Sequence, residues 1–230
     1  MDMGHEPVEK DSSQPGGLSM VQAKKVLFPT DFSDCSRQAF QHAVRLAKDY
    51  GAELHLMHAI VLHEDDPHNP AHHFPDRSRI RTILEELAIK RMGTLIGDQD
   101  IPDLVVRRIH RRGISAAPVI VDYAREEGID LIAMGTHGRR GIRKLLLGSV
   151  AAEVIRLAPC GVLTIRGKAD SAPSQDIRRI LVPIDFHDPA KATLSVACDL
   201  AKENGSGLQL LHVVGELLPP AFLTVGPTNL

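Results

Sequence analysis

Residues 134–150, MGTHGRRGIRKLLLGSV, have the composition of a loop that binds phosphate. Gly135 and Gly138 are separated by two residues, and Gly148 follows after nine more. Because glycine has no Cβ, its backbone N–H group can approach a phosphate chain closely. Gly148 and Ser149 open a predicted helix, whose free N–H groups and positive dipole end favour anions. The pattern therefore predicts a phosphate site with the Ser149 hydroxyl as a further donor, against the alternative of a plain turn with Ser149 as N-cap.

Basic and imidazole side chains in the same loop admit two interpretations. The four basic residues would neutralise phosphate charge, although such residues more often form a solvated surface. His137 is the best candidate for a catalytic base, although a polar contact to a ribose is its more common role in such a loop. The four basic residues are Arg139, Arg140, Arg143 and Lys144.

Two common nucleotide-binding motifs are absent from the sequence. There is no G-x4-G-K-[ST] segment, so this is not a P-loop NTPase. No G-x-G-x-x-G segment follows the first predicted strand, where a dinucleotide-binding fold needs it. Phosphate binding is therefore expected after the fourth predicted strand instead of the first.

The first predicted strand ends in Asp31, which would face Gly135 if the first and fourth strands are neighbours. In an open α/β sheet, ligands bind at the carboxyl ends of the strands where the strand order reverses. Asp31 would there accept a hydrogen bond from ribose hydroxyls or from the amino group of adenine. The backbone at Thr30 and Ala59 would frame the base. The alternative for Asp31 is an N-cap of the following helix, a role for which Ser33 competes.

Apolar and polar residues alternate along the chain in a way typical of an α/β domain. Strands are predicted at residues 26–31, 54–60, 104–109, 129–134 and 161–166, and helices at residues 33–50, 77–96, 115–127 and 149–157, the third capped by Ser115. This order predicts an open parallel sheet with helices on both faces. We assign residues 1–23 to a disordered leader, 24–168 to the nucleotide-binding domain and 169–177 to a linker.

After the linker, the sequence repeats itself. Residues 179–214 align without gaps on residues 25–60, with Pro183 matching Pro29 and Asp185 matching Asp31. Residues 178–230 are therefore predicted to form a truncated second repeat of strand, helix and strand, followed by a tail. Because this repeat lacks the glycine loop, it cannot hold a triphosphate by itself. Its apolar strands need covering, so we expect it to pack on the first domain or on a second copy of the chain, as in a homodimer.

Charge and composition exclude several classes of partner. The formal net charge is −2, so the chain has no overall positive charge that would attract nucleic acid. With no Trp, 2 Tyr and 6 Phe, it also has few aromatic side chains on which bases could stack. The apolar runs are shorter than the roughly 18 residues that a membrane helix needs. The polar N-terminus is not a secretory signal, and 3 cysteines are too few for a disulfide framework. These features favour a reducing, cytoplasmic location.

The first domain resembles the universal stress protein family, in its nucleotide-binding branch. The resemblance covers residues 24–167 and rests on VLFPTDFS, LAKDYGAELHLMHAI, DLIAMGTHGRRGIRKLLLGSVAAEVI and CGVLTIRG. It implies a five-stranded parallel sheet of order 3-2-1-4-5, dimerisation, and bound ATP or its products ADP and AMP, with Mg2+ as an optional companion. Tandem pairs of the domain are common in this family, and here the second unit is incomplete.

By motif position, the resemblance assigns the nucleotide to residues at the ends of the strands and in the glycine loop. Two loop residues with polar side chains, His137 and Arg139, join this predicted site. The residues assigned by resemblance are Pro29, Thr30, Asp31, Ala59, Met134, Gly135, Gly138, Gly148, Ser149 and Val150.

The leading hypothesis for function is a cytoplasmic stress-response regulator that binds ATP. It would be a binding module and not a metabolic enzyme. The sequence does not indicate its protein partner. The rival is a slow ATPase or a self-phosphorylating protein. A third hypothesis is metal sensing by the His-rich loop at residues 63–73. The candidate ligands in that loop are His63, Glu64, Asp65, Asp66, His68, His72 and His73.

Overall fold

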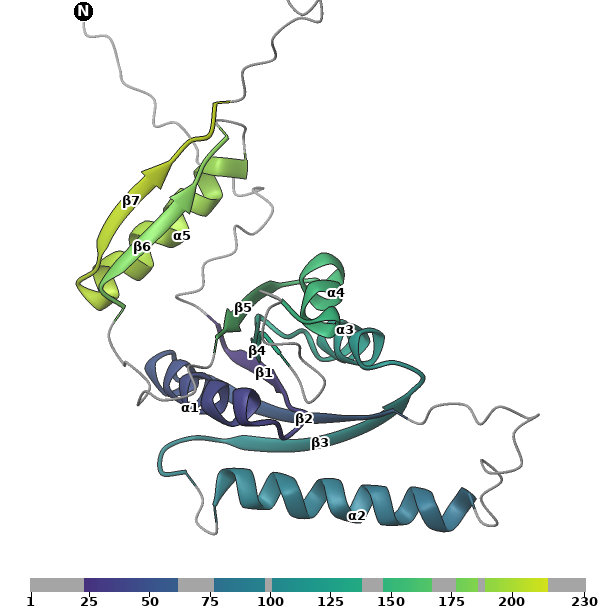
Figure 1. Ribbon diagram of the computed structural model, residues 1–230. Coiled ribbons are helices and arrows are strands. Elements are labelled where there is room, and N and C mark those ends of the chain that lie inside the picture. Colours follow the sequence, from purple (N-terminus) through teal and green to yellow (C-terminus); the bar gives the residue numbers. More distant parts are fainter. Residues whose placement is uncertain are drawn as a thin grey trace, which may run out of the picture. The chain divides into compact units, whose positions relative to one another are not determined.

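The computed structural model describes residues 23–61, 77–97, 101–137, 147–166, 177–185 and 189–214 of the chain. The chain divides into two compact units, Met1–Gln175 and Asp176–Leu230. Figure 1 labels the helices and strands of both units. Within the described residues, no helix combines the length and the apolar character needed to span a bilayer.

The first unit alternates strands and helices as the sequence predicts. Its strands are β1 (Lys25–Pro29), β2 (Glu53–Val61), β3 (Val106–Gly113), β4 (Leu131–Gly135) and β5 (Gly161–Ile165). Its helices are α1 (Asp34–Asp49), α2 (Arg77–Ile96), α3 (Ala116–Glu127) and α4 (Ser149–Leu157). All strand pairs are parallel, and the strand order is β3-β2-β1-β4-β5. The predicted five-stranded sheet of order 3-2-1-4-5 is confirmed.

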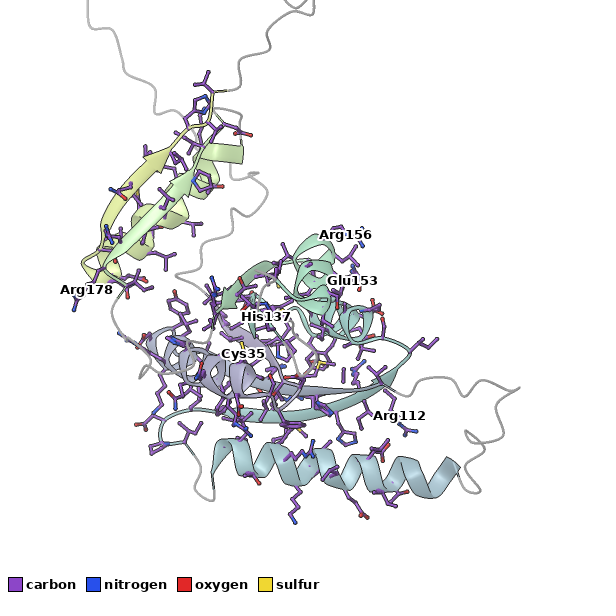
Figure 2. The ribbon with its side chains drawn as sticks, viewed as in Figure 1. Cys35, Arg112, His137, Glu153, Arg156 and Arg178 are labelled. Carbon is purple, nitrogen blue, oxygen red and sulfur yellow. The ribbon has the colours of Figure 1, made fainter. Side chains whose placement is uncertain are left out.

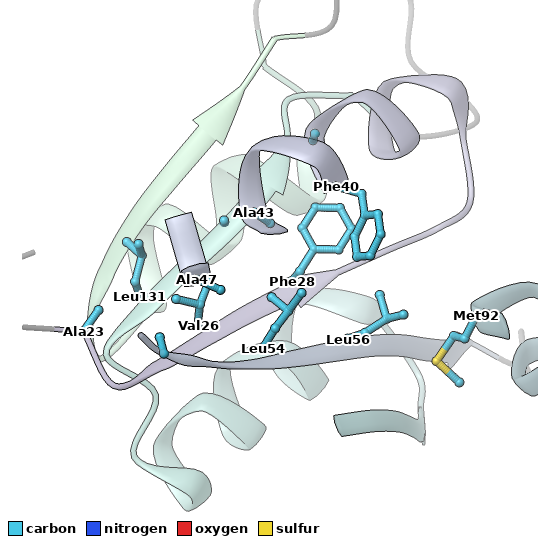
Figure 3. Packing of buried hydrophobic residues seen from close by; sticks show 13 residues of the cluster. Ala23, Val26, Phe28, Phe40, Ala43, Ala47, Leu54, Leu56, Met92 and Leu131 are labelled. Atoms are coloured by element: carbon cyan, nitrogen blue, oxygen red, sulfur yellow. The ribbon is translucent and has the colours of Figure 1, made fainter. Parts of the chain in front are cut away.

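Each face of the sheet packs against two helices and has its own apolar core. Phe28 of β1 belongs to the core shared with α1 and α2, where its ring centroid lies 5.4 Å from that of Phe40 (Figure 3). Leu27, the preceding residue, belongs to the core on the opposite face with residues of α3 and α4. Successive residues of β1 thus serve two cores, which explains why this central strand is a continuous apolar run.

The helix ends follow the capping signals of the sequence, with one exception. α1 begins after Ser33, whose hydroxyl accepts the N–H of Ser36 at 3.2 Å. α3 ends at Gly128, which has a φ of 61°, a left-handed conformation that glycine adopts without strain. Ser115 precedes α3 as predicted, but its side chain makes no capping hydrogen bond.

β3 begins and ends later in the chain than the predicted strand at residues 104–109. Leu104 instead ends a short turn and packs against the core. The strand continues through several arginines because acidic side chains on both faces of the sheet pair with them. Nη1 of Arg107 lies 3.4 Å from Oε2 of Glu127 on α3. Nε of Arg112 lies 2.9 Å from Oε1 of Glu85 on α2.

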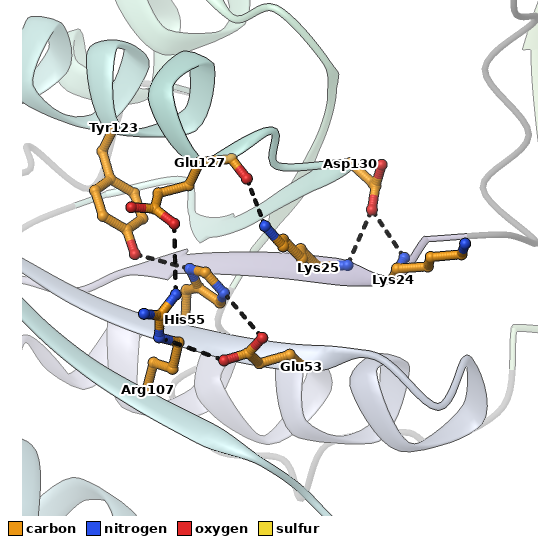
Figure 4. Close-up of polar contacts among 8 residues, drawn as sticks. All are labelled: Lys24, Lys25, Glu53, His55, Arg107, Tyr123, Glu127 and Asp130. Atoms are coloured by element: carbon orange, nitrogen blue, oxygen red, sulfur yellow. Dashed lines mark hydrogen bonds and ion pairs between the residues drawn. The ribbon is translucent and has the colours of Figure 1, made fainter.

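A polar cluster lies near the amino ends of β1, β2 and β3 (Figure 4). His55 of β2 is 0% exposed, and its Nδ1 shares a 2.8 Å hydrogen bond with the Tyr123 hydroxyl. Its Nε2 finds no hydrogen-bond partner among the described residues and lies 3.7 Å from the Glu53 carboxylate. Burial lowers the pKa of His55, although Glu53 opposes this, and burial raises the pKa of Tyr123 to about 12.

The second unit repeats the beginning of the first. It contains β6 (Arg179–Pro183), α5 (Pro189–Asn204) and β7 (Gly207–Leu211), and its two strands are parallel. The N–H of Ile184 donates to the carbonyl of Leu211 at 2.8 Å, and the N–H of Thr30 donates to the carbonyl of Met57 at the same distance. The equivalent bonds confirm the predicted partial second repeat.

Candidate functional site

The strand order of the first unit reverses between β1 and β4. From β1 the chain passes to β2 and β3 on one side, and β4 and β5 lie on the other side. Val26 pairs with Leu131 and Leu27 with Ile132. Extending that register places Thr30 level with the last residue of β4, Gly135. Because ligands bind beyond the carboxyl ends of strands at such a reversal, this edge is the candidate site.

Gly135 brings the end of β4 against the first turn of α1. A Cβ added to Gly135 would lie 3.3 Å from Sγ of Cys35 and 3.5 Å from the Cys35 carbonyl group. Figure 2 labels Cys35 in this part of the first unit. The contact with Sγ is tighter than most real Cβ contacts, so a residue without a side chain suits this position. The sequence predicted the glycine but not its contact with Cys35.

Gly148 brings the start of α4 against the segment that leaves β4. Its N–H donates to the carbonyl of Thr136 at 2.7 Å, and a Cβ added to it would lie 3.0 Å from that oxygen. Gly148 is the N-cap of α4, so Ser149 and Val150, both exposed, are its first residues. The alternative of Ser149 as N-cap is therefore wrong. The first N–H groups of this helix have no partners within the helix, which makes its start suited to an anion.

Thr136 connects β4 to the candidate site. Its N–H donates to the carbonyl of Ile165 at 3.0 Å, which continues the pairing between β4 and β5 by one residue. Its buried hydroxyl shares a 3.0 Å hydrogen bond with Nδ1 of His137. His137 is therefore oriented through Nδ1, in the segment that leaves β4 (Figure 2). Thr136 was not predicted, because the sequence alone does not show which loop residue the helix start will contact.

The turn after β1 carries Asp31, and the bonds around it exclude the helix-cap role considered for this carboxylate. Ser33 is the N-cap of α1, so the alternative of Asp31 as the helix cap is wrong. Oδ1 of Asp31 accepts the N–H of Ser33 at 3.1 Å, which anchors the carboxylate in the turn. Phe32, between them, has a φ of 63°. Such a left-handed conformation is uncommon for a bulky residue and is often found where a site fixes the backbone.

The end of β2 lies beside this turn. His58 donates from Nδ1 to the carbonyl of Thr30 at 2.7 Å, and its ring centroid lies 4.5 Å from that of Phe32. Ala59, the next residue of β2, is partly buried and pairs with Arg111 of β3. The backbone at Thr30 is thus fixed from β2. The side chain of His58 was not predicted to take part.

The structure brings most of the predicted site residues to one edge of the sheet. Ala59 lies one strand further away, at the end of β2. Among the described residues, no group of three His, Cys, Asp or Glu side chains could hold a metal ion. The residues gathered at the ends of β1 and β4 and at the start of α4 are Pro29, Thr30, Asp31, Met134, Gly135, His137, Gly148, Ser149 and Val150.

Several predicted residues lie outside the described residues, so the roles assigned to them stay predictions. They include one glycine of the loop, its basic residues and the whole His-rich loop at residues 63–73. The loop residues concerned are Gly138, Arg139, Arg140, Arg143 and Lys144.

Comparison with known proteins gives matches over both units. A model of the Universal stress protein family matches residues 22–166 and again residues 176–228. Universal stress protein MJ0531 from Methanocaldococcus jannaschii is 32% identical over 145 residues, which cover 62% of this chain and 82% of that protein. Universal stress protein YxiE from Bacillus subtilis is 30% identical over 149 residues, 62% of this chain and 98% of that protein.

Two solved structures resemble the fold. The structure of MJ0577, a second protein of Methanocaldococcus jannaschii, is 30% identical with a TM-score of 0.55 and covers 65% of this chain and 99% of that one. A putative universal stress protein from Pseudomonas aeruginosa is 18% identical with a TM-score of 0.54. It covers 83% of this chain and 62% of its own, and at this identity it supports the fold alone.

Proposed function

This chain belongs to the universal stress protein family, and we propose that its first unit binds ATP or another adenine nucleotide. In this proposal the nucleotide occupies the carboxyl edge of the sheet between β1 and β4. The protein acts as a cytoplasmic stress-response regulator whose conformation or partner choice depends on the bound nucleotide. It is a binding module and not a metabolic enzyme.

The observation that carries the proposal is the placement of the start of α4. Gly148 approaches Thr136 so closely that the helix N-terminus lies at the edge where β1 and β4 diverge. A helix N-terminus supplies unpaired N–H donors and a positive partial charge to a phosphate group. We assign the phosphates to the N–H groups of Ser149 and Val150, with the Ser149 hydroxyl as a further donor. Gly138, Arg139 and an accompanying Mg2+ complete this half of the site in the proposal.

The other half of the proposed site recognises the nucleoside. Asp31 would accept a hydrogen bond from the adenine amino group or from ribose hydroxyls. The backbone at Thr30 and Ala59 would frame the base, with Pro29 and Met134 beside it. This assignment is supported by the anchoring of Asp31 to the N–H of Ser33, because a fixed acceptor distinguishes donors from acceptors on a base better than a mobile one.

Slow ATP hydrolysis or self-phosphorylation is the second candidate, with His137 as the base. Its Nδ1 is held by the Thr136 hydroxyl at 3.0 Å, an arrangement that orients an imidazole. Release of inorganic phosphate from ATP by the wild-type chain but not by His137→Gln would favour this candidate over simple binding. Metal sensing stays a lesser proposal, because its ligands lie outside the described residues.

We further propose a homodimer in a reducing compartment. The three cysteines, Cys35, Cys160 and Cys198, are too few and too scattered along the sequence for a disulfide framework. Exposed apolar residues of the second unit, Leu181 and Leu211, are candidates for the interface between two copies.

The direct test is to identify the nucleotide that co-purifies with the full chain. Denaturing the purified protein and separating the supernatant by chromatography should release ATP, ADP or AMP in an amount comparable to the protein. Release of a guanine nucleotide, or of a dinucleotide, would contradict the proposal.

A further inference from the structure

Two buried hydroxyl groups connect the turn after β1 to helix α1. Oγ1 of Thr30 and Oγ of Ser36 share a hydrogen bond of 2.8 Å. Both residues are nearly fully buried, so their hydroxyls are poorly placed to contact a ligand. Oγ1 of Thr30 also accepts the N–H of Phe32 at 3.0 Å. The pair therefore fixes the backbone on both sides of Asp31, at Thr30 and at Phe32.

The turn contains an unusual backbone conformation. Phe32 has a φ of 63°, which is costly for a bulky side chain and persists only where the surroundings determine it. The Asp31 carboxylate accepts the N–H of Ser33 at 3.1 Å, and the Ser33 hydroxyl accepts the N–H of Ser36 at 3.2 Å. The position of the carboxylate thus depends on a short network that ends at Ser36.

The second unit forms a strand followed by a helix without these hydroxyls. Ile184 stands at the position of Thr30, and Ala190 stands at the position of Ser36. α5 nevertheless follows β6, and His212 still donates from Nδ1 to the carbonyl of Ile184 at 2.8 Å. Formation of the strand and the helix alone therefore does not explain the pair.

We propose that the Thr30–Ser36 hydroxyl pair is a positioning device that gives the site its preference for adenine over guanine. The pair holds the turn so that the Asp31 carboxylate faces the adenine amino group. Ser36 acts through Thr30 and Asp31 and makes no contact with the nucleotide. This inference rests on the proposed nucleotide function and adds to it a determinant of base selectivity.

The test measures the affinities of the full chain for ATP and for GTP by calorimetry. Loss of one buried hydrogen bond weakens an interaction enough to change affinity about tenfold. We therefore expect Thr30→Val and Ser36→Ala each to reduce the ratio of ATP to GTP affinity about tenfold. Thr30→Ser keeps the hydroxyl and should keep the ratio. Thr94→Val is the matched control, because the Thr94 hydroxyl bonds to the Lys90 carbonyl on α2.

Each other outcome decides against the inference. If Thr30→Val and Ser36→Ala lower thermal stability but leave the ratio unchanged, the pair has a structural role only. If the wild-type chain binds ATP and GTP equally well, nucleotide binding stands but the inference is wrong. If the wild-type chain binds neither nucleotide, the proposed function is wrong and the inference fails with it.

Discussion

The N–H of Gly148 donates to the carbonyl of Thr136 at 2.7 Å, and a Cβ at Gly148 would lie 3.0 Å from that same oxygen. The start of α4 is thereby held against the segment that leaves β4. This contact brings a helix N-terminus, which favours anions, to the edge where the strand order reverses. The phosphate half of the proposed site therefore depends on a glycine at this position.

A side chain at Gly148 should disrupt the phosphate half of the site. We expect Gly148→Val to lower ATP affinity at least about tenfold, because the helix start must move away from Thr136 and its N–H donors move with it. Gly138→Val should act in the same direction by filling the path of the phosphates. Calorimetry of both variants measures their affinity for ATP. Gly93→Ala on α2 is the control, since an added Cβ there would meet nothing within 4 Å. Undiminished ATP affinity in both valine variants would contradict the assignment of the phosphate site.

Asp31 should read the base. Its carboxylate can accept from the adenine amino group, whereas guanine presents a carbonyl oxygen there, and two facing acceptors cost about 1–3 kcal/mol. We expect the wild-type chain to prefer ATP, and Asp31→Asn to lose that preference because its amide group can donate to guanine. Competition against a fluorescent ATP analogue measures the affinities for ATP and for GTP. Asp185→Asn, at the matching position of the second unit, is the control. GTP competing as well as ATP for the wild-type site would show that Asp31 does not read the base.

The stability of the protein should decrease in mild acid because of His55. Burial, reinforced by the charges of Arg107 and Lys25 and opposed by that of Glu53, lowers the pKa of His55 in the folded chain from its ordinary value of 6.5. The unfolded chain therefore takes up the proton first, so the stability present above about pH 6.5 is lost as the pH falls below it. We expect the thermal midpoint to fall between pH 7 and pH 5.5, and to fall less in His55→Gln.

The control for this pH dependence is His110→Gln, on the neighbouring strand β3. Because the comparison is between slopes, a uniformly less stable His55→Gln variant remains informative. Equal slopes in the wild type and in His55→Gln would show that another group is responsible for the acid sensitivity.

Apolar residues of the second unit should hold two copies of the chain together. Leu181 and Leu211 are 59% and 44% exposed, whereas Leu27 and Met57 at the matching positions of the first unit are 0% exposed. We expect Leu181→Glu to convert a dimer to a monomer in light scattering, because a charge would replace buried apolar area. Lys202→Glu, at an exposed position of α5, is the control, since it adds negative charge outside the strand face that carries Leu181 and Leu211. A wild-type chain that is monomeric at all concentrations would contradict this expectation.

The fold could be predicted because its signals are local. The strand at residues 161–166 and the helices at residues 77–96 and 149–157 follow from apolar spacing and from caps, and the structure places them within a residue. The bounds of β3 were harder to predict, since a strand rich in arginine depends on acidic partners from other elements. Arg112, for example, pairs with Glu85 of α2, a contact that no local pattern shows.

The candidate site could be predicted in part for the same reason. The glycine spacing indicated Gly135 and Gly148, because a close approach of the backbone requires a residue without a side chain. The partners of these glycines, Cys35 and Thr136, depend on which segments the sheet brings together. Ser36 was missed because its hydroxyl bonds to Thr30 across the turn. The spacing of Ser33 and Ser36, which matches a helix cap, is the signal that would have directed attention to it.

The central claim is that one adenine nucleotide binds per chain, in the first unit. The measurement that tests it most directly is a calorimetric titration of the nucleotide-free full chain with ATP, repeated with Gly148→Val. The account predicts saturable binding of one ATP per chain for the wild type, and binding weakened at least about tenfold for the variant. Absence of ATP binding by the wild type, or equal binding by both proteins, would contradict it.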